Sequence, residues 1–475
     1  MKFHPGSDIL TKKKNKEKET WKPEIFPVDS KEIKEACGIL SDLIKLDTTN
    51  PPGNELIAAN YCKELLEKEG FSDVEVIESE SGRGSVVCRW KGSDPEAKKL
   101  LLLAHLDVVP AHAENWERDP FCGDIEGEYV WGRGSLDCKG LVTTEAMACI
   151  ILKREGFQPK GDVILAFTAD EEDGGVMGVG YLTKNHWDDV NAEYIINEGG
   201  GFLLPLGKNP KDYIVQTGEK GVFRTTIRVR GKGGHGSMPI KRKDSAMYKI
   251  SKITQKIIEY KYPIEITQPV REMAAKMPIP GIAKRLMTSK RMIRPLIKLL
   301  EKFMGDSLSS LLLPFYIDII NPTGLKGSAK VNNIPQYTEM TYDCRLLPGH
   351  DRETVKEYFK NALGKLYKEI EMIPIEPTQP ATINSVENPF WELVEGIMNE
   401  MHEGARLIPM LSAGSTDAKF FRERGSYVLG FVPMRLDPNV QYSEMLEMAH
   451  GRNERMWIPN ISYGIEFIYR LIKSL

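Results

Sequence analysis

Acidic side chains and a histidine stand directly after three short apolar segments of this chain. His105 and Asp107 end the stretch "LLLLAHLDVVPA", residues 100–111, and Glu198 ends "EYIINE". The stretch "DVILAFTADEED" ends in four consecutive acidic residues, Asp170, Glu171, Glu172 and Asp173. Carboxylates that lie close together cannot all stay ionised unless a cation lies between them. If the three segments end at one place, a metal ion bound by histidine and carboxylate ligands is the most direct solution.

Asp137 is a further candidate ligand. It lies in the glycine-rich stretch "WGRGSLDCKG", directly before the helical pattern "KGLVTTEAMACIILKREG". Asp is also a common N-cap residue, so Asp137 could serve only to begin that helix. His105 and Asp107 are two residues apart and would face the same side of a strand. We therefore expect the Asp107 carboxylate to hold the ring of a metal-binding His105.

The surrounding segments predict the elements that position these residues. Residues 30–205 alternate amphipathic helical patterns, such as "SKEIKEACGILSDLIKLD" and "NELIAANYCKELLEKEGF", with apolar runs of strand length. Strands separated by helices indicate an α/β domain with a mostly parallel central sheet flanked by helices. Ligands of such sheets bind beyond the carboxyl ends of the strands, where the acidic residues stand.

The middle of the chain, residues 212–378, predicts a second module. Strand-like alternation in "DYIVQTGEKGVFRTTIRVRG" and "TEMTYDCRLLP" is each time followed by a helical pattern, which is typical of an α+β fold. We expect this module to be inserted in the first domain, which would comprise residues 30–211 and 379–475.

A helical insertion is expected in this module at about residues 270–320. Residues 271–302 contain nine Lys or Arg and two Glu, with apolar residues at helical spacing. A basic amphipathic helix can lie on a membrane surface. Packing on the inserted module, with the lysines in solvent, is favoured because surface helices with an apolar stripe are ordinary.

The composition excludes several function classes. With 475 residues, 41% hydrophobic and 28% charged, the chain can form more than one core. A net charge of −3 argues against nucleic acid, so small molecules or short peptides are the expected partners. Seven scattered cysteines indicate neither a disulfide scaffold nor a cysteine zinc site, and the cytoplasm is the expected compartment. Residues 1–29 lack a long apolar run, so we expect a mobile leader and no signal peptide or membrane span.

From about residue 30 to its end, the chain carries ordered motifs that resemble a known family. They are "AHLDVVP", "WGRGSLDCKG", "TADEEDGG", "INEGGG", "GKGGHGSMP", "VNNIPQ", "YDCRLLPG", "SAGSTDAKFF" and "AHGRNER". The chain resembles the di-zinc metallopeptidase family that contains aminoacylase, bacterial-type glutamate carboxypeptidase, carboxypeptidase S, carnosinase and succinyl-diaminopimelate desuccinylase. The resemblance implies a zinc-peptidase-like catalytic domain with an inserted lid, which in this family often forms a homodimer interface.

The resemblance implies two zinc ions per subunit. One zinc ion would be bound by His105 and Glu198, the other by Glu172 and His450, and Asp137 would bridge them. Each ion then has an imidazole, a terminal carboxylate and a shared carboxylate, which leaves a position for water. The same side chains would also accept cobalt or manganese, or serve a mononuclear hydrolase.

Further residues match the family's catalytic and substrate-binding positions. Glu171 would be the general base, and His235, in "GGHGSMP", would stabilise the oxyanion in the partner subunit's site. Arg345 offers a two-pronged fit to a substrate carboxylate. The alternatives are an ordinary loop histidine and a sheet-surface arginine. The same cleft is expected to be lined by Asn333, Gly414, Ser415, Thr416 and Asp417.

Glu198, in place of Asp, is in this family more usual among acylases and carboxypeptidases. The resemblance therefore implies a hydrolase that cleaves an amide or peptide bond beside a free carboxylate, in an N-acyl amino acid or a short peptide. A dipeptidase that needs a free amino terminus is the alternative. A non-catalytic relative is disfavoured, because the base and all the ligand positions are present.

Overall fold

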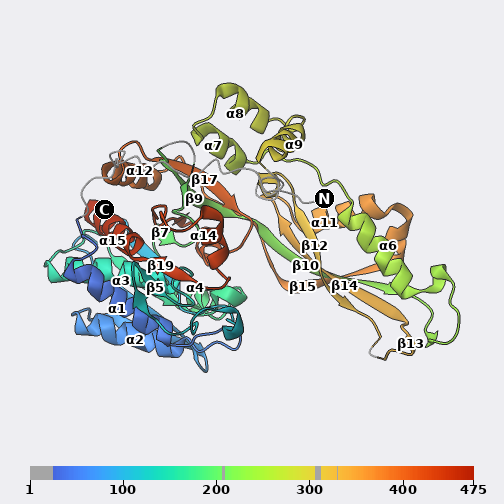
Figure 1. Cartoon of the computed structure of the whole chain (residues 1–475), viewed down its shortest axis with the longest axis horizontal. Coiled ribbons are helices and arrows are strands. Elements are labelled where there is room, and N and C mark those ends of the chain that lie inside the picture. Colours follow the sequence, from blue (N-terminus) through green and yellow to red (C-terminus); the bar gives the residue numbers. More distant parts are fainter. Residues whose placement is uncertain (1–24, 206–208, 305–311, 329) are drawn as a thin grey trace, which may run out of the picture.

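The computed structural model describes residues 25–205, 209–304, 312–328 and 330–475. The leader predicted at residues 1–29 lies outside the described residues, apart from residues 25–29. The described chain forms two lobes that lie side by side (Figure 1). The larger lobe contains a ten-stranded sheet, and the smaller lobe contains a four-stranded sheet.

The ten-stranded sheet is the frame of the larger lobe. Its order is β1-β2-β6-β3-β7-β18-β9-β16, and β8 and β17 also pair with β9. The central strands β6, β3, β7 and β18 run parallel, which confirms the predicted α/β fold. The strands are β1 Val74–Glu80, β2 Arg83–Trp90, β3 Leu100–His105, β6 Val163–Thr168, β7 Tyr194–Asn197, β8 Leu203–Leu204, β9 Asp212–Glu219, β16 Thr382–Ile383, β17 Arg406–Ser412 and β18 Tyr427–Gly430.

Alternate leucines of β3 reach cores on opposite faces of this sheet. Leu100 and Leu102 belong to the core formed with α1 Lys31–Lys45, α2 Leu56–Lys68, α3 Lys139–Arg154, α12 Pro389–Met401 and α15 Ile458–Ser474. Leu101 and Leu103 belong to the core formed with α4 Val179–Asn185, α5 Trp187–Val190 and α13 Ala418–Arg422. Each buried leucine contributes roughly 1.5–3 kcal/mol. The leucine run therefore anchors β3 firmly up to His105, where the strand ends.

The smaller lobe is an antiparallel sheet with two long helices packed on it. Its strands, in the order β12-β14-β10-β15, are Ile319–Lys326, Tyr337–Leu346, Gly221–Arg230 and Ile370–Gln379. The helices are α6 Ala246–Ile258 and α11 Arg352–Leu363. A separate pair of short strands, β11 Gly234–His235 and β13 Asn333–Ile334, lies at the end of this lobe that is far from the larger lobe (Figure 1).

Strand β9 corrects the expected start of the inserted module at residue 212. Asp212–Glu219 pairs with β17 and β18, so it belongs to the ten-stranded sheet. The chain enters the smaller lobe only at β10, after Lys220. The return is at β16, which pairs with β9 directly after β15 has completed the smaller sheet.

The helical insertion contacts the larger lobe as well as the inserted module, on which it was expected to pack. Its helices are α7 Gln268–Lys276, α8 Gly281–Met287 and α9 Ile293–Met304. Met273 and Ala274 of α7 pack with Ile408 of β17. Ile293 of α9 packs in a neighbouring cluster with Tyr316. Across the described ranges, no helix is long and apolar enough to cross a membrane.

Four further elements lie close to the site. Strands β4 Ile125–Glu126, β5 Tyr129–Trp131 and β19 Arg455–Trp457 form a small sheet. Helix α14, Tyr442–Met448, precedes β19 in the chain. The loop between α14 and β19 carries His450, so these elements position the last of the predicted ligands.

Candidate metal centre

The structure brings the five predicted metal ligands together beyond the carboxyl ends of the parallel strands. His105 ends β3, Glu172 lies in the short turn after β6, and Glu198 follows β7. Asp137 comes from the loop before α3, and His450 from the loop after α14. Five separate segments therefore converge on one site, in the position where α/β sheets bind their ligands.

Asp137 lies between two groups of possible ligand atoms. Its Oδ1 is 3.0 Å from His105 Nε2, which lies 3.9 Å from Glu198 Oε2. Its Oδ2 is 3.1 Å from His450 Nε2, which lies 3.0 Å from Glu172 Oε2. Each group offers one imidazole and two carboxylates, which is a common donor set for zinc. One carboxylate is thus placed to serve both groups.

The electrostatics of the cluster fit a bound cation. Burial, with the charges of neighbouring carboxylates, raises the pKa of Glu198 to about 8. Burial and the charge of Glu198 also raise the pKa of Glu171 well above its usual range. Among the described residues, Glu172 Oε1 and Asp417 Oδ1 are buried without a hydrogen-bond partner. A cation would offset the repulsion and satisfy the buried oxygen of Glu172.

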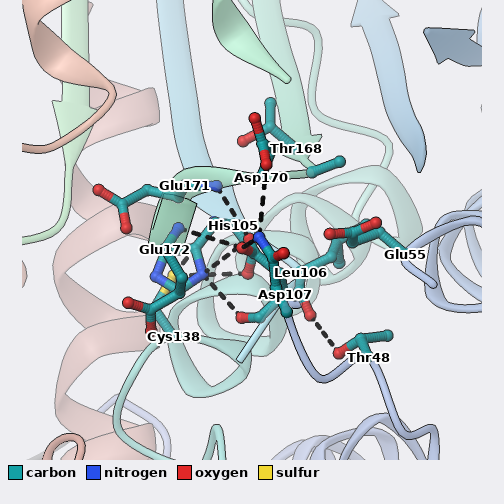
Figure 2. Close-up of polar contacts among 12 residues, drawn as sticks. Thr48, Glu55, His105, Leu106, Asp107, Cys138, Thr168, Asp170, Glu171 and Glu172 are labelled. Carbon is teal, nitrogen blue, oxygen red and sulfur yellow. Dashed lines mark hydrogen bonds and ion pairs between the residues drawn. The ribbon is translucent and has the colours of Figure 1, made fainter. Parts of the chain in front are cut away.

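Asp107 acts differently from the sequence expectation, because β3 ends at His105. The Nδ1 atom of His105 lies 2.9 Å from the backbone oxygen of Asp107 and 3.5 Å from its carboxylate. The carboxylate accepts hydrogen bonds from the backbone N–H groups of Glu171 and Glu172, each at 3.1 Å (Figure 2). It also accepts one from the Asn50 side chain at 2.9 Å. Burial opposes ionisation of Asp107, but these contacts and His105 lower its pKa. Asp107 therefore fixes the turn that carries two site residues.

Asp137 is positioned by a buried ion pair that the sequence did not single out. Helix α3 has Cys138 at its N-cap and no side-chain cap bond, so Asp137 is not a capping residue. Glu454 Oε1 accepts hydrogen bonds from the backbone N–H groups of Leu136, at 2.7 Å, and Asp137, at 3.1 Å. Glu454 Oε2 lies 2.6 Å from Arg133 Nη1, and both side chains are buried. The only sequence signal for Glu454 is its place in the motif "AHGRNER".

A cleft of about 410 Å³ extends from the ligands to the smaller lobe. The larger lobe lines it with Glu171 and metal ligands, and with three expected residues, Gly414, Ser415 and Thr416. The smaller lobe contributes Arg345 and Arg224, which lie 2.7 Å and 3.3 Å from carboxylate oxygens of Asp343. Arg224 is an addition to the predicted site. One end of the cleft is thus rich in carboxylates, and the other carries two guanidinium groups.

Residues 101–474 match the peptidase family M20/M25/M40. The chain belongs to this family. Carboxypeptidase S from Saccharomyces cerevisiae is 28% identical, with 81% of this chain and 73% of that protein covered. Aminoacylase-1 from Sus scrofa is 24% identical, with 91% and 93% covered. The crystal structure of an M20 family metallo-carboxypeptidase, Sso-CP2 from Sulfolobus solfataricus, matches with a TM-score of 0.69 and 21% identity, covering 94% of this chain and 99% of that one.

Membership of the M20 family confirms the resemblance to metallopeptidases and the prediction of a metal-dependent hydrolase. The likeness to Sso-CP2 confirms the predicted fold. In the terms of this family, the larger lobe is the catalytic domain and the smaller lobe is the lid. The candidate metal ligands all come from the catalytic domain, and the two arginines of the cleft come from the lid.

Two predicted site residues of this M20 peptidase lie away from the cleft. His235 and Asn333 pair across β11 and β13, are both exposed, and lie at the far end of the lid (Figure 1). His235 Nδ1 contacts Ser237 Oγ at 2.7 Å. The expectation that Asn333 lines the same cleft is wrong within one chain, because the lid holds it at the opposite end from Arg345.

Cys138 lies among the first group of ligand atoms, although the cysteine pattern indicated no cysteine metal site. Its Sγ falls within 4.8 Å of candidate ligand atoms of His105, Asp137 and Glu198. It already accepts the backbone N–H of His105 at 3.1 Å. Burial raises the pKa of the Cys138 thiol. The thiol therefore supports the position of His105.

Proposed function

We propose that this chain hydrolyses an amide or peptide bond whose leaving amino acid carries a free carboxylate. The observation that supports it is the composition of the cleft, with a metal-type cluster at one end and Arg224 and Arg345 at the other. A guanidinium group fits a carboxylate with two parallel hydrogen bonds. A substrate held in this way places the bond on the amino side of that carboxylate towards the cluster.

In this proposal His105 with Glu198, and Glu172 with His450, would each hold one zinc ion, and Asp137 would be shared. When bound, the ions supply an acidified water and a polarised substrate carbonyl. Cobalt or manganese would suit the same ligands. Metal analysis of the chain purified without added metal tests the proposal. It predicts two metal ions per chain, and one ion per chain would contradict the shared role of Asp137.

Glu171 is the proposed general base. Its carboxylate lines the cleft beside the ligands, takes a proton from the attacking water and delivers it to the leaving amine. Glu171→Gln should therefore keep the metal and lose nearly all turnover, whereas Asp137→Ala should lose both. Equal metal loss in the two variants would show that Glu171 is a ligand and not the base.

The substrate class is tested with three compounds that share one amino acid: its N-acetyl derivative, the carboxamide of that derivative, and a dipeptide with a free amino terminus. The proposal predicts that the N-acetyl amino acid is cleaved and the carboxamide is a poor substrate. Arg345→Ala should lower kcat/KM for the carboxylate form about 10- to 100-fold, because one charged hydrogen-bonding group is lost.

Arg228→Ala is the matched control for Arg345→Ala. Arg228 lies on the lid strand β10, pairs with Glu339 at 2.7 Å and does not line the cleft. Equal cleavage of the carboxylate and the carboxamide would refute recognition of the carboxylate. Strong preference for the free dipeptide would instead identify a dipeptidase.

We further propose that His235 and Asn333 serve the active site of a second copy of this chain. Their exposed positions at the far end of the lid support this, because neither lines the cleft of its own chain. A mixture of Glu171→Gln and His235→Ala chains tests the idea, since a mixed dimer contains one site with all its residues intact. Activity should appear after mixing two inactive proteins. No recovery in a verified mixed dimer would show that His235 acts within its own chain, and full activity of His235→Ala alone would show that it does not act at all.

A further inference from the structure

A second cavity, of about 230 Å³, lies beside the metal centre. Asp137 and Glu198 line both this cavity and the cleft that contains Glu171. The cavity therefore adjoins the point where the reacting carbonyl group would lie. All residues that line it belong to the catalytic domain, whereas the two arginines of the cleft belong to the lid.

The walls of this cavity are mainly apolar. They include Leu141, Phe202, Val432, Met434, Met445 and Met456. The polar side chains in the wall are already bonded: Thr144 Oγ1 donates to the Gly140 carbonyl at 2.8 Å, and Asn460 Oδ1 accepts the Arg435 N–H at 2.7 Å. Apart from the metal ligands, the cavity offers an incoming group dispersion contacts and few hydrogen bonds. An apolar group is the occupant that such walls favour.

The size of the cavity limits the group that it can hold. An apolar protein cavity of about 150 Å³ accommodates benzene, so 230 Å³ is enough for roughly a phenyl ring with one or two methylenes. Methionine side chains are flexible and can adapt to groups of different shape. Met445 lies on α14 and is partly exposed, so this wall faces the outside of the domain.

We propose that this cavity binds the acyl side of the substrate and selects apolar acyl groups of about six to eight carbon atoms, an inference that rests on the proposed function. The substrate carboxylate is directed towards Arg345 on the lid, and the carbonyl carbon lies at the metal ligands. The substituent on the other side of that carbonyl then has the apolar cavity as its nearest enclosed space. The preferred substrates are amino acids whose N-acyl group is apolar and longer than acetyl, or peptides with an apolar residue at that position.

A series of N-acyl derivatives of one amino acid tests this selection. Acetyl, butyryl, hexanoyl, octanoyl and dodecanoyl compounds are hydrolysed by the metal-loaded enzyme, and the released amino acid is measured. Each buried methylene should raise kcat/KM about fourfold until the cavity is full. The rise should stop near hexanoyl or octanoyl. Equal kcat/KM for acetyl and hexanoyl compounds would overturn the inference while leaving the proposed hydrolase intact.

Substitutions in α14 test whether this cavity determines the preference for acyl-chain length. Met445→Ala enlarges the cavity and should move the preference towards longer acyl chains, whereas Met445→Trp fills it and should move the preference towards acetyl. Glu447→Ala is the matched control, because Glu447 is exposed on the same helix and does not line the cavity. An unchanged hexanoyl-to-acetyl ratio in both Met445 variants would overturn the assignment.

A binding measurement separates this inference from the proposed reaction. Calorimetry with Glu171→Gln compares the affinity of the N-hexanoyl and N-acetyl amino acids without turnover. Tighter binding of the hexanoyl compound, reduced by Met445→Trp, supports the cavity even if neither compound is hydrolysed by the native enzyme. Equal affinities overturn it, whatever the native enzyme hydrolyses.

Discussion

The buried ion pair of Arg133 and Glu454 gives the most direct test of how the metal centre is held. Glu454→Ala removes the carboxylate 2.6 Å from Arg133 and the acceptor of two backbone N–H groups, those of Leu136 and Asp137. Removing one partner of a buried ion pair costs about 3–5 kcal/mol. Arg133 keeps its bond to the Gly451 carbonyl at 2.6 Å, so we expect a loss of about 4 kcal/mol.

The loss is measured as the change in the free energy of urea unfolding, with metal removed so that metal binding does not contribute. Glu67→Ala is the control, because Glu67 pairs with Lys63 at 3.8 Å on the exposed surface and should change stability by less than about 1 kcal/mol. A loss in Glu454→Ala no larger than that of the control would refute the structural role assigned to the buried pair.

The same variant should also weaken metal binding. Glu454 accepts a hydrogen bond from the backbone N–H of Asp137, the proposed shared ligand, and is not one of the candidate ligands. Loss of such a supporting group typically lowers metal affinity about 10- to 100-fold. Titration of the metal-free variant with zinc measures this change. Unaltered zinc affinity in Glu454→Ala, together with lost stability, would restrict the pair to folding and separate it from the metal centre.

Three further predictions concern removal of the metal, the positioning role of Asp107 and the pH dependence of stability. A chelator should abolish turnover and lower the melting temperature, and added zinc should restore both. Asp107→Ala should lower turnover about 10- to 100-fold, because it frees the turn that carries Glu171; kcat is measured on protein saturated with metal. Burial, aided by Lys211 and Arg435, lowers the pKa of His402 from 6.5 to about 4. The stability that His402 contributes is complete above pH 6.5 and is lost as the pH falls towards 4, so melting curves of His402→Gln should show less acid destabilisation.

The parallel sheet and the ends of its strands could be predicted because the signal is local. Four leucines in succession suit a strand buried on both faces, and the structure divides them between two cores. The residues that follow such strands must lie at the carboxyl edge of the sheet, whatever the rest of the chain does. This is why His105, Glu172 and Glu198 could be grouped from sequence before any contact between them was known.

The boundary of the lid could not be located in the same way. Strands β9 and β10 are separated by Lys220 alone, and both read as apolar strand segments. Nothing in such a pattern says which sheet a strand joins, because pairing partners are set by distant segments such as β17 and β14. The apolar stripe of α7 likewise predicts a buried face but not its partner, which is Ile408 of the catalytic domain.

Side-chain roles that depend on where the backbone turns could also not be predicted from the sequence. The spacing of His105 and Asp107 suggested that both face one side of a strand, but the strand ends between them. The backbone oxygen of Asp107 then faces the imidazole, and its carboxylate turns to the N–H groups of the following acidic turn. The residue types indicated that His105 and Asp107 interact, but only the local backbone geometry shows which of their atoms are in contact.

The order of the ligands along the chain couples the lid to the metal centre. His105 and Glu198 belong to segments before the lid, whereas His450 and Glu454 come after it. The shared ligand Asp137 precedes the lid, but the carboxylate that fixes its backbone arrives from the far side. The second group of candidate ligands, and the support of Asp137, can therefore form only when the segments before and after the lid pack together, as they do where β16, β17 and β18 pair with β9. Arg345 of the lid lines the same cleft as these candidate ligands, so residues from both sides of the lid and from the lid itself meet at one site.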